Sequence, residues 1–380
     1  MRFFHISDLH IGKTLEGNSL HEDMRYILLD EILGRAYDKY KPEALVIAGD
    51  IYDKANPTPE CIELFEDLLD KAVEKGLKVF IISGNHDNAV RVSYGRNHFR
   101  KNGIYISEPF SAKRPYSIEK LGGVNFCMLP FASKNRIQAA FPNERFKTST
   151  EAHRFVLNKL RAELPEGEPA VLIAHQGVNT GGETMGFIDT VDASVFEGFT
   201  YTALGHYHSP ITLGEKNNIR YCGSLLMFTE KEVHRERTLS VVEIDAAGAL
   251  TVTEEALQPL HRVIAYTNSC EELLSDEIPA NAKDFVFIRL TKMPENSLVQ
   301  IAAIDAKFPN HLRIRPPQVK AINTRPAAKL ICEEEAGFDK VFQAFLEEML
   351  GKGEEDKLRQ LVDEGIRLFK EAEENADKNA

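Results

Sequence analysis

Short apolar segments recur along the first part of the chain, and polar side chains follow each of them directly. Five such segments have the length of a buried strand rather than of a helix. They are residues 2–6, 44–48, 79–83, 170–174 and 201–204. Segments with helical periodicity separate several of them. This alternation predicts an α/β domain in which helices cross between neighbouring strands.

The helical pattern is clearest over residues 58–75. Thr58 is a suitable cap, Pro59 suits the first turn, and Gly76 is expected to end the helix. The apolar residues at helical spacing are Ile62, Phe65, Leu69, Ala72 and Val73. Because they share one face, we expect the helix to pack on the sheet between the second and third apolar segments.

Weaker patterns complete the first domain. We expect helices over residues 91–102 and 149–163. Strands that look antiparallel are residues 104–106, 116–119 and 123–129. A second sheet is predicted from alternating segments at 219–222, 237–245 and 249–256. The expected architecture of residues 1–258 is an α/β fold, a two-sheet sandwich flanked by helices.

Beyond this domain the pattern changes to that of a small α+β unit, which we expect to span residues 259–322. Residues 323–336 have the composition of a linker, and residues 337–380 contain two amphipathic helices separated by glycines. Such a helix-loop-helix is too short to bury its apolar faces well by itself. It packs either against its own domain or against a partner, and the pattern leaves both readings open.

The composition is that of a folded protein of the cytoplasm. Hydrophobic residues make up 43% of the 380 residues, which is ample for two or three domain cores. The chain begins with a strand-like segment rather than a signal peptide, and about 18 apolar residues never run together. The five cysteines are scattered, without a Cys-x-x-Cys pair. We therefore expect core thiols, a cytoplasmic location and no membrane insertion.

The polar residues at the strand ends are of the kinds that bind metals. They are Asp8, His10, Asp50, Asn85, His175, His206 and His208. Any one of them could be a helix cap or a satisfied core residue, but five strand ends in succession share the pattern. Carboxylate, imidazole and amide ligands without a thiolate favour manganese or another borderline cation over a structural zinc.

These motifs resemble the motif series of the calcineurin-like metallophosphoesterases. The matching motifs are Asp8-x-His10, Gly49-Asp50, Gly84-Asn85-His86-Asp87, His175 and Gly205-His206-x-His208. Asp53 and the runs 198–208 and 221–224 are similar to one branch of the family, the SbcD-type nuclease subunits of double-strand-break repair. The resemblance is strong over about the first two-thirds of the chain and holds only in outline for the rest.

The resemblance implies the fold of that family and a centre with two cations. The ligands implied for one cation are Asp8, His10 and His208, those for the other are Asn85, His175 and His206, and Asp50 is implied to bridge the two. His86 would protonate the leaving oxygen, and Asp53 or Asp87 would orient imidazoles from behind. Two Mn²⁺ are the expected cofactors, with Mg²⁺ or another divalent cation as the alternative.

The resemblance also implies a substrate and partners. The chain would be a manganese-dependent exonuclease and endonuclease acting on double-stranded DNA ends and on hairpins. The α+β unit would be a cap that shapes DNA access. Residues 337–380 would grip the coiled-coil base of an SbcC-like ATPase. Helices of the catalytic domain, either the one at 58–75 or the one after residue 91, would form a homodimer.

The net charge of −12 is compatible with DNA binding because most of the negative charge lies in residues 331–380. Residues 331–380 hold 15 acidic and 7 basic residues, a balance of −8, which leaves −4 for the rest of the chain. The residues that we expect to contact DNA phosphates are Arg91, Arg96, Arg100, Lys101, Arg313 and Arg315. The last two belong to a stretch, 311–330, that contains neither Asp nor Glu. The alternative for both clusters is an ordinary solvated face.

Two other functions are alternatives for a chain with these residues. A phosphoesterase of nucleotides or other small phosphodiesters would need the whole centre, but it has no use for the α+β unit and the terminal helices. A regulatory subunit without activity would not need so complete a ligand set. Cleavage of duplex ends or hairpins separates the first alternative from a DNA nuclease, and metal content tests the second.

Overall fold

The computed structural model describes residues 1–179, 190–233, 235–280, 282–293 and 297–317. The chain divides into two compact units. The first comprises Met1–Tyr266, Pro279–Ile288 and Ile304–Ile314, and the second comprises Thr267–Ile278, Arg289–Ala303 and the few described residues from Arg315. This division differs from the expected boundary after residue 258, which stays a prediction. Within the described ranges, no helix is both long enough and apolar enough to cross a membrane.

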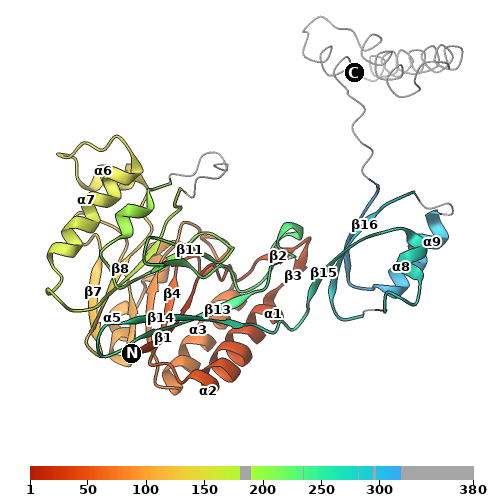
Figure 1. The fold of residues 1–380 in the computed structure, drawn as a ribbon, viewed down its shortest axis with the longest axis horizontal. Helices are drawn as coiled ribbons and strands as arrows, with labels where there is room; N and C mark the ends of the chain where they lie inside the picture. The colour runs from red at the N-terminus through yellow and green to blue at the C-terminus, as the bar shows by residue number, and fades with distance from the viewer. Residues whose placement is uncertain (180–189, 234, 281, 294–296, 318–380) are drawn as a thin grey trace, which may run out of the picture. The chain divides into compact units, whose positions relative to one another are not determined.

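The first sheet has six strands in the order β14-β13-β1-β4-β5-β6 (Figure 1). They are β1 (Arg2–Ile6), β4 (Ala44–Ala48), β5 (Lys78–Ile82), β6 (Ile104–Ile106), β13 (Thr238–Ile244) and β14 (Leu250–Ala256). Strands β1, β4, β5 and β6 are parallel, whereas β13 is antiparallel to β1. Two expectations are therefore wrong: β6 is not antiparallel, and the β13–β14 hairpin does not belong to the second sheet. The hairpin completes the edge of β1, and local alternation does not say which edge a hairpin will join.

The second sheet has the order β11-β12-β10-β9-β8-β7. Its strands are β7 (Ser117–Leu121), β8 (Val124–Leu129), β9 (Ala170–His175), β10 (Tyr201–Gly205), β11 (Ile211–Leu213) and β12 (Ile219–Tyr221). Its four inner strands are parallel, and the two edge strands are antiparallel to their neighbours. The predicted antiparallel pairing of β7 with β8 is confirmed. A short hairpin, β2 (Thr14–Leu15) and β3 (Asn18–Ser19), stands apart from both sheets.

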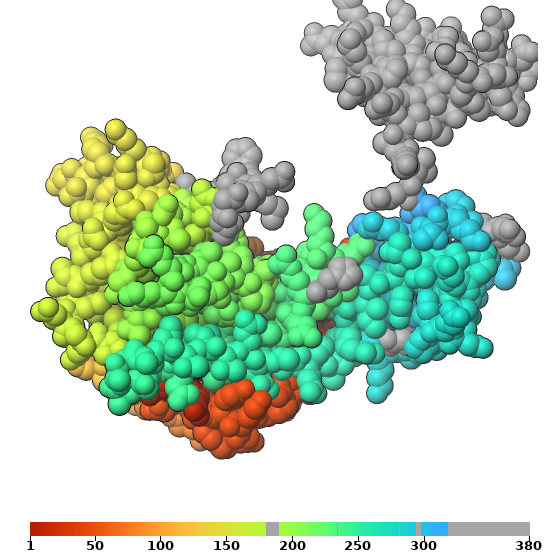
Figure 2. Space-filling model, in the orientation of Figure 1, coloured from red at the N-terminus to blue at the C-terminus, as the bar shows by residue number. Residues whose placement is uncertain are grey.

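The two sheets pack face to face, and helices cover their outer faces (Figure 1). Alternate residues of β1 show the layering: Phe3 lies between the sheets, where it contacts Phe126, while Phe4 belongs to the helix-covered core. Few dark red atoms of this first strand are visible on the face shown in Figure 2, in keeping with its burial. The predicted helix-flanked sandwich is confirmed.

Helices α1 (His21–Tyr26), α2 (Tyr37–Tyr40) and α3 (Pro59–Glu74) belong to the first sheet's outer layer, and a π-helix, η1 (Ile27–Ala36), joins α1 to α2. The predicted helix α3 is present, but its buried face is rotated about the helix axis relative to the predicted one. Ile62 is 48% exposed, and Cys61 and Leu64 are buried instead. The Thr58 hydroxyl donates to the Cys61 sulfur rather than capping the helix with its oxygen.

The remaining helices of the first unit fall in the connections after β5, β8, β9 and β12. They are α4 (Ala89–Val92), α5 (Arg96–Phe99), α6 (Lys134–Ala140) and α7 (Ser149–Ala162), with 3₁₀ turns η2 (Arg100–Asn102), η3 (Ala193–Phe196) and η4 (Glu230–Glu232). The single helix expected over 91–102 is wrong. Gly95 has φ of 73°, a left-handed conformation that a continuing α-helix does not contain, so the segment breaks into short pieces.

A smaller sheet follows, with the order β15-β16-β17. Its strands are β15 (Val263–Asn268), β16 (Phe285–Leu290) and β17 (His311–Arg315), and its helices are α8 (Cys270–Leu274) and α9 (Ser297–Lys307). This element order agrees with the α+β pattern expected for 259–322. The predicted linker at 323–336 and the helix-loop-helix at 337–380 lie outside the described residues.

Candidate metal centre

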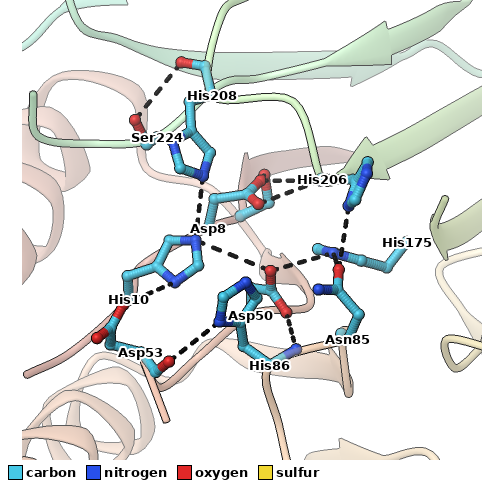
Figure 3. A network of polar contacts seen from close by, with 12 residues as sticks. Asp8, His10, Asp50, Asp53, Asn85, His86, His175, His206, His208 and Ser224 are labelled. Carbon is cyan, nitrogen blue, oxygen red and sulfur yellow. Dashed lines mark hydrogen bonds and ion pairs between the residues drawn. The ribbon is translucent and has the colours of Figure 1, made fainter. Parts of the chain in front are cut away.

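The seven predicted ligands come together at the carboxyl ends of strands from both sheets (Figure 3). Asp8 and His10 follow β1, Asp50 follows β4, Asn85 follows β5, His175 ends β9, and His206 and His208 follow β10. Parallel strands bring their carboxyl ends to one edge of a sheet, and here two such edges face each other. Residues far apart along the chain therefore share one site.

The backbone is strained at four of these residues. Asp8, His10, Asp50 and His206 all have positive φ, with values of 51°, 44°, 50° and 115°. Such conformations cost energy for residues with a side chain and persist where the surroundings impose them, most often at functional sites. Here the strain turns the side chains into the site directly after the strands.

Three motif glycines allow the backbones around the centre to approach one another. A Cβ atom on Gly84 would lie 2.1 Å from Asp50 Oδ1, and one on Gly49 would lie 2.5 Å from His175 Nδ1. A Cβ atom on Gly205 would lie 2.1 Å from the Ala48 carbonyl oxygen. The motif glycines are thus needed for close approach and not only for turning the chain.

Asp8, His10 and His208 form the first half of the centre. Their ligand atoms lie within 4.8 Å of one another, and the Nε2 atoms of His10 and His208 are 3.1 Å apart. Asp8 accepts hydrogen bonds from the His206 backbone N–H and from the Ser7 hydroxyl. The carboxylate and two ring nitrogens therefore point to a common position.

Asn85, His175 and His206 form the second half. The Asn85 side-chain oxygen lies 3.0 Å from His175 Nε2 and 3.0 Å from His206 Nδ1. His175 Nδ1 donates to the Ala48 carbonyl at 2.8 Å, which fixes the ring so that Nε2 faces the centre.

Asp50 lies between the two halves. Its Oδ2 atom is 3.8 Å from His10 Nε2 and 3.3 Å from His175 Nε2, so one oxygen faces a ring of each half. Its other oxygen accepts the His86 backbone N–H at 2.9 Å. This is the geometry that a bridging carboxylate requires.

Burial and charge set the protonation of the centre. Burial lowers the pKa of His10 to about 3 and of His206 to about 4, so both rings are neutral near pH 7. Burial also opposes a charge on His175, but Asp50 outweighs it and raises the pKa of His175 to about 9. Burial, with the Asp50 carboxylate nearby, raises the pKa of Asp8. A cation between the halves would relieve this repulsion and could replace the His175 proton.

The donor set fits divalent cations. Three overlapping groups are close enough to ligate: Asp8, His10 and His208; Asp8, Asp50 and His175; His10, Asp50 and His86. His10 Nε2 and His208 Nε2 gain little from facing each other unless a cation or a proton lies between them. The oxygen and nitrogen ligands of these groups suit manganese, iron, zinc or magnesium.

His86 lies beside the centre rather than in either half. Its ring is 4.8 Å from the ring of His10, at 88°. Its Nδ1 donates to the Asp53 backbone carbonyl at 3.0 Å, which leaves Nε2 to act as ligand or proton donor.

Asp53 and Asp87 have different surroundings. The Asp53 carboxylate accepts a hydrogen bond from Lys13 at 2.7 Å and lies 3.7 Å from His10 Nδ1, a position that can orient this ring. The Asp87 carboxylate instead accepts backbone N–H groups of Ile51, Tyr52 and Gly84. It therefore ties the loops after β4 and β5 together.

The predicted DNA-contacting residues are partly engaged within the chain. Arg96 pairs with Glu108, Arg100 with Glu119, and Arg313 with Glu16. Arg91 donates to the Asn56 side-chain oxygen, Lys101 is exposed and Arg315 is half-buried. Intramolecular ion pairs reduce the positive charge that such clusters offer to a phosphate.

Several residues around the centre were missed by the sequence reasoning. Phe228 packs edge-on against both His10 and His208, and Lys13 Nζ lies 5.3 Å from the centre of the Phe228 ring. Glu232 and Arg237 lie against His208. The stretch that contains Phe228, Glu232 and Arg237 reads as an ordinary polar loop, and it has no local signal comparable to a strand end.

The chain is similar to known proteins over most of its length. Residues 1–210 match the family model for calcineurin-like phosphoesterases. The D subunit of nuclease SbcCD from Staphylococcus epidermidis is 30% identical over 303 residues, which cover 77% of this chain and 79% of that protein. The protein of the same name from Staphylococcus saprophyticus is 31% identical over 293 residues, covering 75% and 76%.

A solved structure was also matched, that of TT1561 from Thermus thermophilus. The TM-score is 0.38 at 9% identity, over 67% of this chain and 98% of that one. The family match spans more than half of the chain and includes every strand end of the centre. The chain therefore belongs to the calcineurin-like phosphoesterases and is a metal-dependent hydrolase of phosphate esters.

Proposed function

We propose that the chain is a manganese-dependent DNA nuclease, an exonuclease and endonuclease that cleaves DNA ends and hairpins during repair and recombination in the cytoplasm. The convergence of seven ligand-type side chains, with Asp50 between the two halves, is the observation that carries the hydrolytic part. The similarity to the D subunits of two SbcCD nucleases over three-quarters of the chain supports DNA as the substrate.

In this proposal the two halves each hold one Mn²⁺. Bound there, the cations would supply an activated water and would screen the charge of the phosphoryl oxygens. Asp8, His10 and His208 hold the first site, and Asn85, His175 and His206 hold the second. Asp50 keeps the sites at a fixed separation.

His86 supplies the proton that the leaving oxygen needs. Because Nδ1 donates to the Asp53 carbonyl, Nε2 is the atom that can carry a proton toward the substrate. Asp53 fixes the His86 ring through its backbone and the His10 ring through its carboxylate. Asp87 acts only through the loops that it joins.

DNA and an ATPase are the proposed partners. Arg91 and Lys101 have no acidic partner within the described residues, so their charges are available to a phosphate. The α+β unit acts as the cap, and the segment 337–380 binds the SbcC-like ATPase. The assignment of the ATPase to this segment rests on the sequence pattern and on the family.

A homodimer is proposed through the helices after β4 and β5. This region exposes large apolar side chains: Ile62 on α3 is 48% exposed, Val90 on α4 is 68% exposed, and Tyr94 is 84% exposed. Large apolar side chains that are exposed to solvent can mark an interface. Sedimentation of Tyr94→Glu against the parent chain tests this part.

The function is tested by digestion of duplex and hairpin DNA with Mn²⁺ and with Mg²⁺, with and without the co-purified ATPase. We expect cleavage with Mn²⁺. Hydrolysis of a small phosphodiester without any cleavage of DNA would instead establish the alternative, a phosphoesterase of small substrates. Removal of residues 337–380 should abolish ATPase binding but leave metal content unchanged.

A further inference from the structure

Residues that follow His208 in the chain contact both its backbone carbonyl and its ring. We call Ser224, Phe228, Glu232 and Arg237 the 224–237 brace. In Figure 3 the contact between Ser224 and the His208 backbone is drawn.

The brace fixes the backbone of His208. The His208 carbonyl accepts a hydrogen bond from the Arg237 guanidinium at 2.7 Å and from the Ser224 backbone N–H at 3.2 Å. Arg237 is only 7% exposed, so this contact is shielded from water. Hydrogen bonds from a charged donor in such surroundings are stronger than ordinary ones.

The brace also fixes the His208 ring. Glu232 Oε1 lies 3.7 Å from His208 Nδ1, the nitrogen opposite the one that faces His10. The ring of Phe228 packs edge-on against the imidazole, with 5.4 Å between centroids. A carboxylate next to one ring nitrogen of a histidine orients the ring and makes the other nitrogen a stronger metal ligand.

Glu232 and Arg237 hold each other in place. Glu232 Oε2 accepts the Arg237 guanidinium at 2.5 Å and the Phe228 backbone N–H at 3.0 Å. Its Oε1 also accepts the Thr229 hydroxyl at 3.1 Å. The carboxylate therefore joins the His208 ring, the Arg237 guanidinium and the Phe228 backbone in one network, and of these residues only His208 is a predicted ligand.

We propose that Glu232 and Arg237 are positioning residues for the reaction, which hold His208 so that its Nε2 completes the first cation site beside Asp8 and His10. The inference rests on the proposed two-cation function and deepens it. It makes the first site depend on a segment that follows β12, whereas the second site is held by its own ligands and by the Ala48 carbonyl.

The test is a titration of the full chain with Mn²⁺, followed by calorimetry and electron paramagnetic resonance. The variants are Glu232→Ala, Arg237→Ala and Arg237→Lys, which keeps the charge but lacks the planar fork. The matched controls are Glu236→Ala and Lys231→Ala, which remove the same charges from exposed neighbours. Urea unfolding in the presence of a chelator checks that each variant is folded.

We expect two Mn²⁺ sites in the parent chain, one of which weakens roughly 10- to 100-fold in Glu232→Ala and Arg237→Ala. The other site and the controls should change little, Arg237→Lys should recover part of the loss, and every variant should remain folded in chelator. The resonance signal of a coupled Mn²⁺ pair should give way to that of an isolated ion.

Two sites of unchanged affinity in both alanine variants would overturn the inference and leave the proposed function intact. Equal weakening of both sites together with a lower free energy of unfolding would also overturn it, because it would indicate a merely structural role. A parent chain that binds no Mn²⁺ would overturn the proposed function, and the inference with it.

Discussion

Different interactions hold the side chains of the two halves of the candidate metal centre. In the second half the ligands contact one another, since Asn85 meets both His175 and His206, and a proton on His175 balances Asp50. In the first half, neutral His10 faces His208 with 3.1 Å between nitrogens. The first half therefore depends on a cation, and the second holds together around a proton that a cation would replace.

The difference has a structural origin. His175 is the last residue of β9, its side chain is fully buried, and a backbone carbonyl of the opposite sheet orients its ring. The His208 side chain is 29% exposed and lies in a loop, so residues from elsewhere must orient it. The sheet fixes the position of a ligand at a strand end, whereas a ligand in a loop needs contacts with other residues to hold it.

The largest effect is expected where the halves meet. Asp50→Asn keeps the shape of the side chain but removes the negative charge that faces His10 and His175. We expect both cation sites to weaken more than roughly 100-fold and hydrolysis to be lost. Metal analysis after gel filtration measures this. Asp192→Asn, a change at the N-terminus of η3, is the control. One site of parental affinity in Asp50→Asn would mean that the halves are independent.

His86 is expected to affect activity without affecting either half. His86→Ala removes the proposed proton donor but none of the ligands assigned to the two sites. Hydrolysis should slow roughly 10²- to 10⁴-fold at unchanged metal content. His98→Ala, in the short helix α5, is the matched control. If the His86 variant lost a cation instead, its place in the group with His10 and Asp50 would be that of a ligand.

Paired alanine variants compare the halves by stability. His175→Ala leaves the buried Asp50 carboxylate without its ion pair, and we expect the metal-free protein to lose about 3 kcal/mol of unfolding free energy. His208→Ala should cost about 1 kcal/mol or less, because its ring is part-exposed. Urea unfolding in chelator measures both. Equal losses would contradict the distinction drawn between the halves.

The smallest expected effect is on pH dependence. The pKa of His175 is raised to about 9, so its stabilisation is complete below the ordinary pKa of 6.5 and disappears as pH rises toward 9. The pKa values of His10 and His206 are lowered to about 3 and about 4, so their contribution disappears as pH falls below 6.5.

The metal-free chain should therefore be most stable near pH 6.5. Thermal unfolding across roughly pH 4 to 10, in chelator, provides the measurement. His175→Ala should lose the decline on the alkaline side and keep the one on the acid side. An alkaline decline of full size in that variant would assign it to other groups.

Most of the centre could be predicted from the sequence because its signals are local. An apolar run, a glycine and a ligand-type side chain stand within a few residues of one another at each strand end, as at Gly49 and Asp50 or at Gly84 and Asn85. The fold class follows from the same runs. These features depend on backbone conformation and side-chain type, which neighbouring residues determine.

What only the tertiary structure decided depends on residues distant in the chain. The edge that β13 joins, the backbone partners of Asp87 and the contact of Arg237 with His208 are each set by packing between segments. No short pattern encodes them, because a backbone carbonyl or a buried guanidinium is available as a partner only after the sheets have come together. The ligand-type residues could be identified from the sequence, but the residues that hold them in position could not.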